Sequence, residues 1–205
     1  MSLARRERLA LVDAMTATGP DAPTLCEGWT TRDLAAHLVV RERRPDTAPG
    51  VLLKPLAGHT ERVRRDAAKR PWPELLEQVR TGPPVLLRPF DAAINATEMF
   101  VHHEDVRRGT PGWSPRELGM ADERELWSAL RRMAKLSYRR STVTVVLETP
   151  DGDHVEVKRP GDRRVVLLGR PSELLLHATG RNAVRLETNG AAGDIAAVGE
   201  LQRGL

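Results

Sequence analysis

The sequence predicts an α+β protein in which a helical bundle over residues 1–140 is followed by a small α+β module over residues 141–205. Two observations carry this prediction. Up to Ser141, apolar residues recur at helical spacing in one segment after another. After Ser141, β-branched runs alternate with Pro-Asp-Gly-Asp and Pro-Gly-Asp turns, which is the pattern of a β-meander. A chain of 205 residues has room for one good-sized domain and a small second module.

The first part of the chain divides into helices at its Pro and Gly residues. A helix is expected over residues 3–17, and the next helix has a nearly complete start signal in Thr30 as N-cap and Asp33 as capping-box acid. Trp29 precedes this start and can pack against Leu34 one turn later. The second helix should end at about Arg44, before a proline. A Pro/Gly-rich loop follows, and four more helices are expected at about 56–69, 73–80, 90–107 and 121–137.

The module after Ser141 is expected to hold three strands, a helix, a strand and a helix. The three strands lie in STVTVVLETPDGDHVEVKRPGDRRVVLLG. A helix should begin at Pro171 and end at Gly180, because proline is favoured at the first position of a helix and glycine just after its end. Residues 183–188 then read as a last strand, and 193–204 as a terminal helix.

Two histidines and one glutamate are the candidate metal ligands. Glu98 and His102 are four residues apart in FDAAINATEMFVHHEDVRRG, so they lie one turn apart on one face of the 90–107 helix. His37 lies in the helix that follows Thr30. Two imidazoles and one carboxylate, with no obvious fourth ligand, are typical of an open metal site of the catalytic kind. A closed structural site would more often use cysteines, and the chain has one.

The placement of these side chains strengthens the metal hypothesis. Asn95 and Asp105 fall on the same stripe of the helix as Glu98 and His102, between flanking apolar residues. This stripe is therefore centred on the face that should be buried in the bundle. Burying a carboxylate and an imidazole is costly unless they are paired or bind a metal. Asp105 could orient a ligand or be a simple salt-bridge acid.

Each candidate also has a reading without a metal. His37 could be a satisfied core histidine, and Glu98 could pair with an arginine. His103 points away from His102 and is expected at the surface or in packing, and His59 is expected on a solvated helix face or lining a pocket. Cys26, as a lone cysteine, is expected to be buried and inert rather than nucleophilic.

Composition argues against several classes of partner. The sequence pI is about 9.8, but the formal net charge is only +4, and the arginines are scattered and usually beside Asp or Glu. Aromatic residues make up 3%, which leaves little for stacking on bases, so nucleic acid is not expected as a partner. No long apolar run indicates a membrane span, and the charged N-terminus does not resemble a signal peptide. We therefore expect a soluble, cytoplasmic protein without a disulfide framework.

Three segments together resemble a known family. LCEGWTTRDLAAHL, ATEMFVHHEDVRRG and LLGRPSELLLHATGR occur in the order found in the actinobacterial mycothiol-dependent maleylpyruvate isomerase family, within the DinB/YfiT-like superfamily of metal-binding four-helix bundles. The resemblance covers nearly the whole chain. It implies a DinB-like four-helix bundle, a small C-terminal module like sterol carrier protein, and metal ligation by His37, Glu98 and His102.

The resemblance also implies a chemistry. A divalent metal, with zinc as the expected ion, would hold a water or a small thiol such as mycothiol at an open position. Coordination lowers the pKa of a thiol and supplies thiolate at neutral pH. The thiolate could add to an activated double bond and leave after rotation, as in an isomerase, or displace a leaving group, as in a transferase. Arg41, one turn after His37, is the candidate for binding an anionic substrate group.

Three classes of function stay open at this stage. The first is the metal-dependent thiol isomerase or transferase, acting on a small electrophilic or anionic substrate. The second is a metal-dependent hydrolase with bound water as the nucleophile. The third is a non-catalytic protein whose C-terminal module binds an apolar ligand or a partner. The protein could be a monomer or a homodimer in any of these classes.

Overall fold

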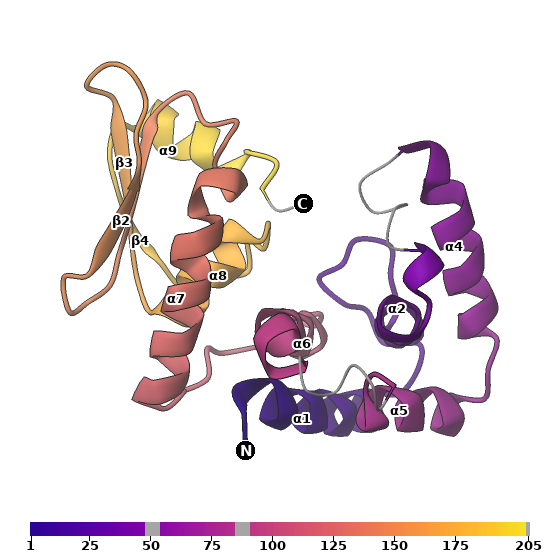
Figure 1. Cartoon of the computed structure of the whole chain (residues 1–205). Helices are drawn as coiled ribbons and strands as arrows, with labels where there is room; N and C mark the ends of the chain where they lie inside the picture. The colour runs from indigo at the N-terminus through magenta and orange to yellow at the C-terminus, as the bar shows by residue number, and fades with distance from the viewer. Residues whose placement is uncertain (48–53, 85–90, 204–205) are drawn as a thin grey trace. The chain divides into compact units, whose positions relative to one another are not determined.

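A computed structural model describes residues 1–47, 54–84 and 91–203, with side chains described from 57 in the second range and from 95 in the third. Its contacts divide the chain into two compact units, Met1–Trp113 (unit 1) and Ser114–Leu205 (unit 2). The division falls after Trp113, whereas the sequence suggested 1–140 and 141–205. Unit 1 is helical and unit 2 combines helices with a sheet (Figure 1). The predicted α+β class is confirmed.

Unit 1 contains five of the described α-helices and one short 3-10 turn. Helix α1 packs against α5 and α6, while α2 packs against α4 and α5. The predicted loop over 44–55 and the predicted helix start at residue 90 fall partly outside the described residues. The elements are α1 (Leu3–Thr18), α2 (Thr31–Arg43), η1 (Pro45–Thr47), α4 (Lys54–Ala68), α5 (Trp72–Thr81) and α6 (Asp91–Arg107).

The core of unit 1 is apolar, and a buried ion pair joins three of its helices. Leu11 and Met15 from α1, Leu34 and Leu38 from α2, and Met99 from α6 belong to one cluster and are fully buried. Beside this cluster, the guanidinium of Arg8 donates to both carboxylate oxygens of Glu42, at 2.5 and 3.0 Å, and to the carbonyl oxygen of Val79. These bonds join α1, α2 and α5. Removing one partner of such a pair is costly because the other charge stays buried.

The first helix of unit 2 is α7 (Met120–Ser137), which the sequence had assigned to the bundle. The predicted bounds, 121–137, are close to those observed. The buried residues of α7 include Leu126, Leu130 and Ala134. Within unit 2, α7 contacts α8 and β2. Apolar periodicity shows which face of a helix is buried, but it does not show against which neighbour. This is why the predicted boundary near residue 140 differs from the division after Trp113.

The sheet of unit 2 is mixed, with strand order β2-β1-β3-β4, so the predicted meander is wrong in its pairing. β1 (Thr144–Glu148) pairs in parallel with β3 (Arg164–Leu168) and antiparallel with β2 (His154–Val157). β3 also pairs antiparallel with β4 (Glu187–Asn189). The apolar strands β1 and β3 are the most buried and occupy the centre, and β2 lies at the edge.

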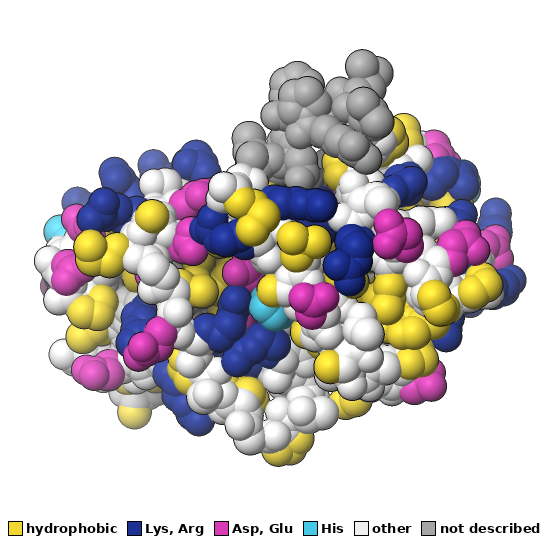
Figure 2. Space-filling view, turned by 90° about the horizontal axis from the view of Figure 1, so that it is seen from below, with side chains coloured by type: hydrophobic (Ala, Val, Ile, Leu, Met, Phe, Trp, Pro, Cys, Tyr) yellow, Lys and Arg dark blue, Asp and Glu magenta, His cyan; other side chains and the backbone are white. Residues whose placement is uncertain are grey.

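Two helices complete unit 2, α8 (Pro171–Ala178) and α9 (Ala192–Gly199). The N-terminus of α8 is capped from α7, because the Glu123 carboxylate accepts hydrogen bonds from the amide and hydroxyl of Ser172, both at 2.9 Å. A carboxylate at this position complements the positive end of the helix dipole. No helix within the described ranges is long and apolar enough to cross a membrane. On the face shown in Figure 2, basic and acidic side chains are interspersed.

Candidate metal centre

The start of α2 fixes the position of His37. Thr30 and Asp33 form the predicted capping box: the Thr30 amide donates to the Asp33 carboxylate at 3.0 Å, and the Asp33 amide donates to the Thr30 hydroxyl at 3.3 Å. Trp29 packs against the core cluster that contains Leu34, and its ring lies 5.3 Å from the ring of His37. His37 thus projects from the second turn of a well-capped helix.

Helix α6 carries the polar stripe that the sequence predicted at its buried face. Asn95, His102 and Asp105 are 4%, 8% and 0% exposed, respectively, although all three are polar. Glu98 lies on the same stripe with its side chain 26% exposed. The stripe is therefore partly open at Glu98, between the buried Asn95 and the buried His102, and closed at Asp105. Burying these polar side chains costs free energy of desolvation. Polar partners from α2 and from the loop before it offset part of this cost.

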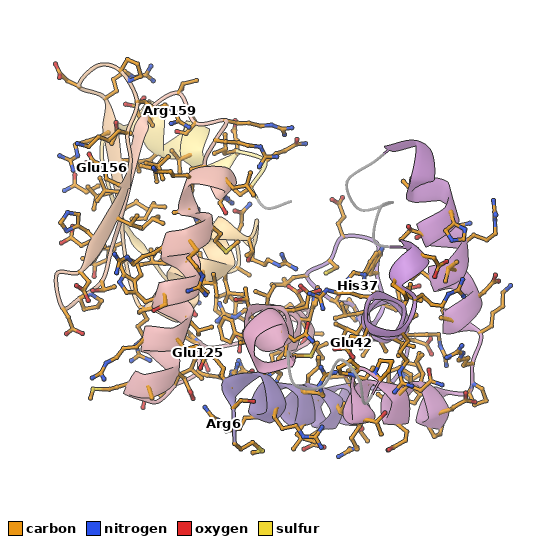
Figure 3. The ribbon with its side chains drawn as sticks, viewed as in Figure 1. Arg6, His37, Glu42, Glu125, Glu156 and Arg159 are labelled. Atoms are coloured by element: carbon orange, nitrogen blue, oxygen red, sulfur yellow. The ribbon has the colours of Figure 1, made fainter. Side chains whose placement is uncertain are left out.

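The three predicted ligands come together between α2 and α6. The Nε2 atom of His37 lies 3.3 Å from Oε1 of Glu98, and Nε2 of His102 lies 3.2 Å from the same oxygen. One ligand atom from each residue lies within 4.8 Å of the other two. His37 is seen on α2 in Figure 3, and its side chain is 29% exposed. The cluster is thus partly accessible from the His37 and Glu98 side.

Asp105 holds the ring of His102 in place. Its Oδ2 atom lies 2.8 Å from Nδ1 of His102, which leaves Nε2 facing Glu98 and His37. A carboxylate can only accept in this contact, so Nδ1 carries the hydrogen. This is the arrangement by which carboxylates orient metal-binding histidines. Of the two roles left open for Asp105, the geometry favours orientation of His102.

Cys26 was expected to be buried and inert, but it is partly buried and contacts the network of His102, which the sequence did not predict. Its Sγ lies 3.2 Å from Oδ2 of Asp105, and the amide of Leu25 donates to the carbonyl oxygen of Asp105 at 3.0 Å. The loop approaches α6 closely because Gly109 has no side chain: a Cβ there would overlap the carbonyl oxygen of Pro23. Periodicity gives no signal for such a contact, because the loop has no repeating pattern. Cys26, His102 and Asp105 form a second group with ligand atoms within 4.8 Å.

The pKa values of His37 and His102 are shifted in opposite directions. Burial lowers the pKa of His37, against the hydrogen bond to Glu98, which raises it. Burial also opposes protonation of His102, but its hydrogen bonds to Asp105, Cys26 and Glu98 raise its pKa well above the usual value. For Glu98, burial raises the pKa, but hydrogen bonds from His102 and His37 outweigh it and leave the pKa well below normal. Without a metal, His102 is therefore the protonated member.

Arg41 lies at the edge of the cluster but is engaged within it. Its Nε is 3.2 Å from Oε1 of Glu98, and its Nη1 donates to Oδ1 of Asn95. The alternative in which Glu98 pairs with an arginine is thus present in the structure, beside the histidine contacts. The Arg41 side chain is 31% exposed.

The remaining histidines of unit 1 lie outside the cluster. His103 is buried, and its Nδ1 lies 2.8 Å from the carboxylate of Glu7, so it joins α6 to α1 in packing. His59 is exposed, and its Nε2 lies 2.9 Å from Asp46. Neither histidine belongs to a group of candidate ligands among the described residues.

Comparison with known proteins gives one family and one fold. Residues 1–48 match the family described as the mycothiol maleylpyruvate isomerase N-terminal domain. A crystal structure of the mycothiol-dependent maleylpyruvate isomerase matches with a TM-score of 0.55 and 15% identity, over 99% of this chain and 93% of that chain. At this identity the likeness shows the shared fold alone. No curated protein matches the chain in sequence. The match over residues 1–48 agrees with the resemblance to the mycothiol-dependent maleylpyruvate isomerase family, and the shared fold is that of a protein of this name.

Proposed function

We propose that this protein is a metal-dependent enzyme that uses a small thiol, mycothiol, to isomerise or conjugate a small electrophilic substrate. The observation that carries the proposal is the convergence of two imidazole nitrogens and a carboxylate oxygen within 4.8 Å, from two helices. The family match over residues 1–48 and the fold shared with a mycothiol-dependent maleylpyruvate isomerase support the thiol as cofactor.

The donor set fits a divalent cation such as zinc. Zinc is commonly bound by nitrogen and oxygen donors at about 2.0–2.2 Å, so two donors of one ion lie about 3–4 Å apart. The Nε2 atoms of His37 and His102 lie 3.3 and 3.2 Å from Oε1 of Glu98, which falls in this range. When bound, the cation would lower the pKa of a thiol or water at its open position.

The chain's own residues have distinct tasks in this proposal. His37 and His102 donate nitrogen lone pairs, and Glu98 offsets part of the cation's charge. Asp105 keeps the hydrogen of His102 on Nδ1, so that Nε2 is free to bind once its proton is lost. Arg41, whose side chain is 31% exposed at the edge of the cluster, is proposed to bind an anionic group of the substrate.

The first test is the metal content of the purified protein. We expect close to one divalent ion per chain, and we expect His37→Ala and His102→Ala to lose most of it. His59→Ala is the matched control, because His59 is an exposed histidine outside the cluster. Full metal occupancy in both cluster variants would show that the site is misassigned.

The second test separates a thiol enzyme from a hydrolase at the same site. Turnover of electrophilic substrates, maleylpyruvate among them, is measured with mycothiol, with glutathione and without thiol. Activity that requires mycothiol, and that falls in His37→Ala but not in His59→Ala, is the expected result. Equal turnover of an ester or amide without any thiol would overturn the thiol proposal and favour the hydrolase.

A further inference from the structure

A pocket of about 450 Å³ is lined by residues of unit 2. The metal cluster belongs to unit 1 and shares no residue with this pocket. The pocket is bounded by the residues that follow β1, by Arg170 and Pro171 after β3, and by the first turns of α7. Because β1 and β3 are parallel, the loops after both strands meet at one edge of the sheet. In parallel sheets this edge is a common place for ligands. The volume is in the usual range for a small-molecule site.

The lining combines an apolar surface with an excess of negative charge. Trp127, which is 7% exposed, contributes a largely covered aromatic surface. Four carboxylates face two guanidinium groups, which leaves a formal excess of two negative charges. The apolar members are Leu118, Met120, Trp127, Pro150 and Pro171, and the charged ones are Glu117, Glu123, Asp151, Asp153, Arg124 and Arg170.

Several of these charges are already engaged inside the unit. Glu123 caps Ser172, and Arg170 lies 3.6 Å from Glu117. Asp151 and Asp153 form no ion pair or side-chain hydrogen bond with any described residue. Both belong to the turn after β1. The negative charge that is open for a ligand is therefore concentrated at this turn.

Thr149, at the start of the same turn, supplies an independent sign of a missing partner. The residue lines the pocket and is 4% exposed. Its hydroxyl oxygen is buried and has no hydrogen-bond partner among the described residues. A buried hydroxyl without a partner is costly, so it marks a position where a ligand group can complete the structure. The turn backbone is itself satisfied, since the Thr149 amide donates to the carbonyl oxygen of Asp153.

We propose that this pocket binds a small organic ammonium ion with an apolar body. The ammonium group would be held by Asp151, Asp153 and the hydroxyl of Thr149, and the apolar body would lie against Trp127. An ammonium group offers hydrogen-bond donors and no acceptor, which matches two carboxylates and a hydroxyl oxygen. An aromatic side chain favours the same class of ligand, because a cation near its face is attracted to the ring.

The test uses three probes of similar shape and different charge: phenethylammonium, neutral 2-phenylethanol and anionic 3-phenylpropionate. Binding to the full chain is followed at low salt by NMR, at the indole N–H of Trp127. Phenethylammonium should saturate this signal and bind at least about tenfold more tightly than the other two, since charge-assisted hydrogen bonds are the stronger ones. Equal affinity for the neutral probe would overturn the proposal.

Variants then locate the binding groups. Asp151→Asn with Asp153→Asn should weaken phenethylammonium binding about tenfold, and Thr149→Val about threefold to tenfold. Thr149→Ser keeps the hydroxyl and should bind like the parent, which separates loss of the hydroxyl from a folding defect. Asp162→Asn removes an exposed acid outside the pocket and should change nothing. Unchanged affinity in the double variant, or in Thr149→Val, would show that the ligand is not held as proposed.

Discussion

His102 in unit 1 and His177 in unit 2 are both buried imidazoles in polar networks, but their partners carry opposite charge. His102 contacts the carboxylates of Asp105 and Glu98. His177 contacts the guanidinium of Arg203, at 2.8 Å from Nε2, and the hydroxyl of Tyr138, at 2.7 Å from Nδ1. An arginine can only donate, so Nε2 of His177 accepts and Nδ1 carries the hydrogen.

This difference sets the charge of each ring. Burial, with the nearby charge of Arg203, lowers the pKa of His177 to about 3, so this imidazole stays neutral. At His102 the hydrogen bonds that the ring donates to the carboxylates of Asp105 and Glu98 outweigh burial and raise the pKa. The networks also differ in access, because the cluster around His102 includes the partly exposed His37 and Glu98, whereas Tyr138, His177 and Arg203 are all buried. Of these two buried histidines, only His102 lies among acceptors in a network that includes partly exposed side chains, so His102 is the candidate ligand.

The largest effect expected from this comparison is acid destabilisation of unit 2. The pKa of His177 is about 3 in the folded protein and about 6.5 when unfolded, so the unfolded state binds the extra proton between these values. Stability is then fully present above pH 6.5 and is lost as pH falls towards 3, by up to about 4–5 kcal/mol. Hydrogen exchange of the α8 amides as a function of pH measures the loss in this unit.

A His177→Phe variant is the control for that assignment. It cannot take up the proton, so the pH dependence of α8 exchange between pH 6.5 and 3 should become shallower, even if the variant is less stable overall. An equally steep dependence in this variant would mean that other groups cause the acid sensitivity.

An intermediate effect is expected from Asp105→Asn, which keeps the shape of the residue that orients His102. The variant replaces a charged carboxylate acceptor with a neutral amide. The preference of the His102 hydrogen for Nδ1 over Nε2 therefore becomes weaker. Such partners of metal-binding histidines are worth about 10- to 100-fold in metal affinity. Competition with a chelator of known affinity measures the change. Asp46→Asn is the matched control, since Asp46 pairs with the exposed His59; equal affinity in both variants would contradict the role of Asp105.

The smallest stability effect is expected from Arg41→Ala, which contrasts with the buried Arg203. Arg41 is partly exposed and pairs with Glu98, and pairs of this kind contribute about 0–1 kcal/mol. Its proposed role lies in substrate binding, so KM for an anionic substrate should rise more than kcat falls. Thermal unfolding and steady-state kinetics check the two parts. A fall in kcat at unchanged KM would assign Arg41 to a different task.

The sequence predicted the helices and the three-residue cluster well, because both depend on local rules. Capping by Thr30 and i, i+4 spacing of Glu98 and His102 are properties of single helices. That His37 lies beside them was inferred from its place in a second well-capped helix and from the family resemblance, because no local rule joins residues on two helices. The metal ligation itself stays a prediction, as do the mycothiol cofactor, the oligomeric state and the cytoplasmic location.

What the sequence did not predict depends on long-range pairing. β1 pairs in parallel with β3, although the other strands have a similar composition. Apolar alternation shows which face of a strand is buried, but it does not show which strand lies beside it. The same holds for α7, whose periodicity was clear and whose unit was not. The contact of Cys26 with Asp105 joins residues far apart in the chain, one of them in a loop, and no spacing rule reaches across that distance.

The close approach at Gly109 limits how far the metal cluster can be treated as a transferable motif. Three ligands on two helices look simple to graft onto another helical scaffold. In this protein, however, α6 supplies two of the ligands, and the loop before α2 packs against its C-terminal end. Leu25 and Cys26 of this loop contact Asp105, and Gly109 leaves space for the loop where no side chain fits. A design that copied His37, Glu98 and His102 alone would lack Asp105 and Cys26, which hold the His102 ring in its orientation. The smallest portable unit of this site includes a glycine that never touches it.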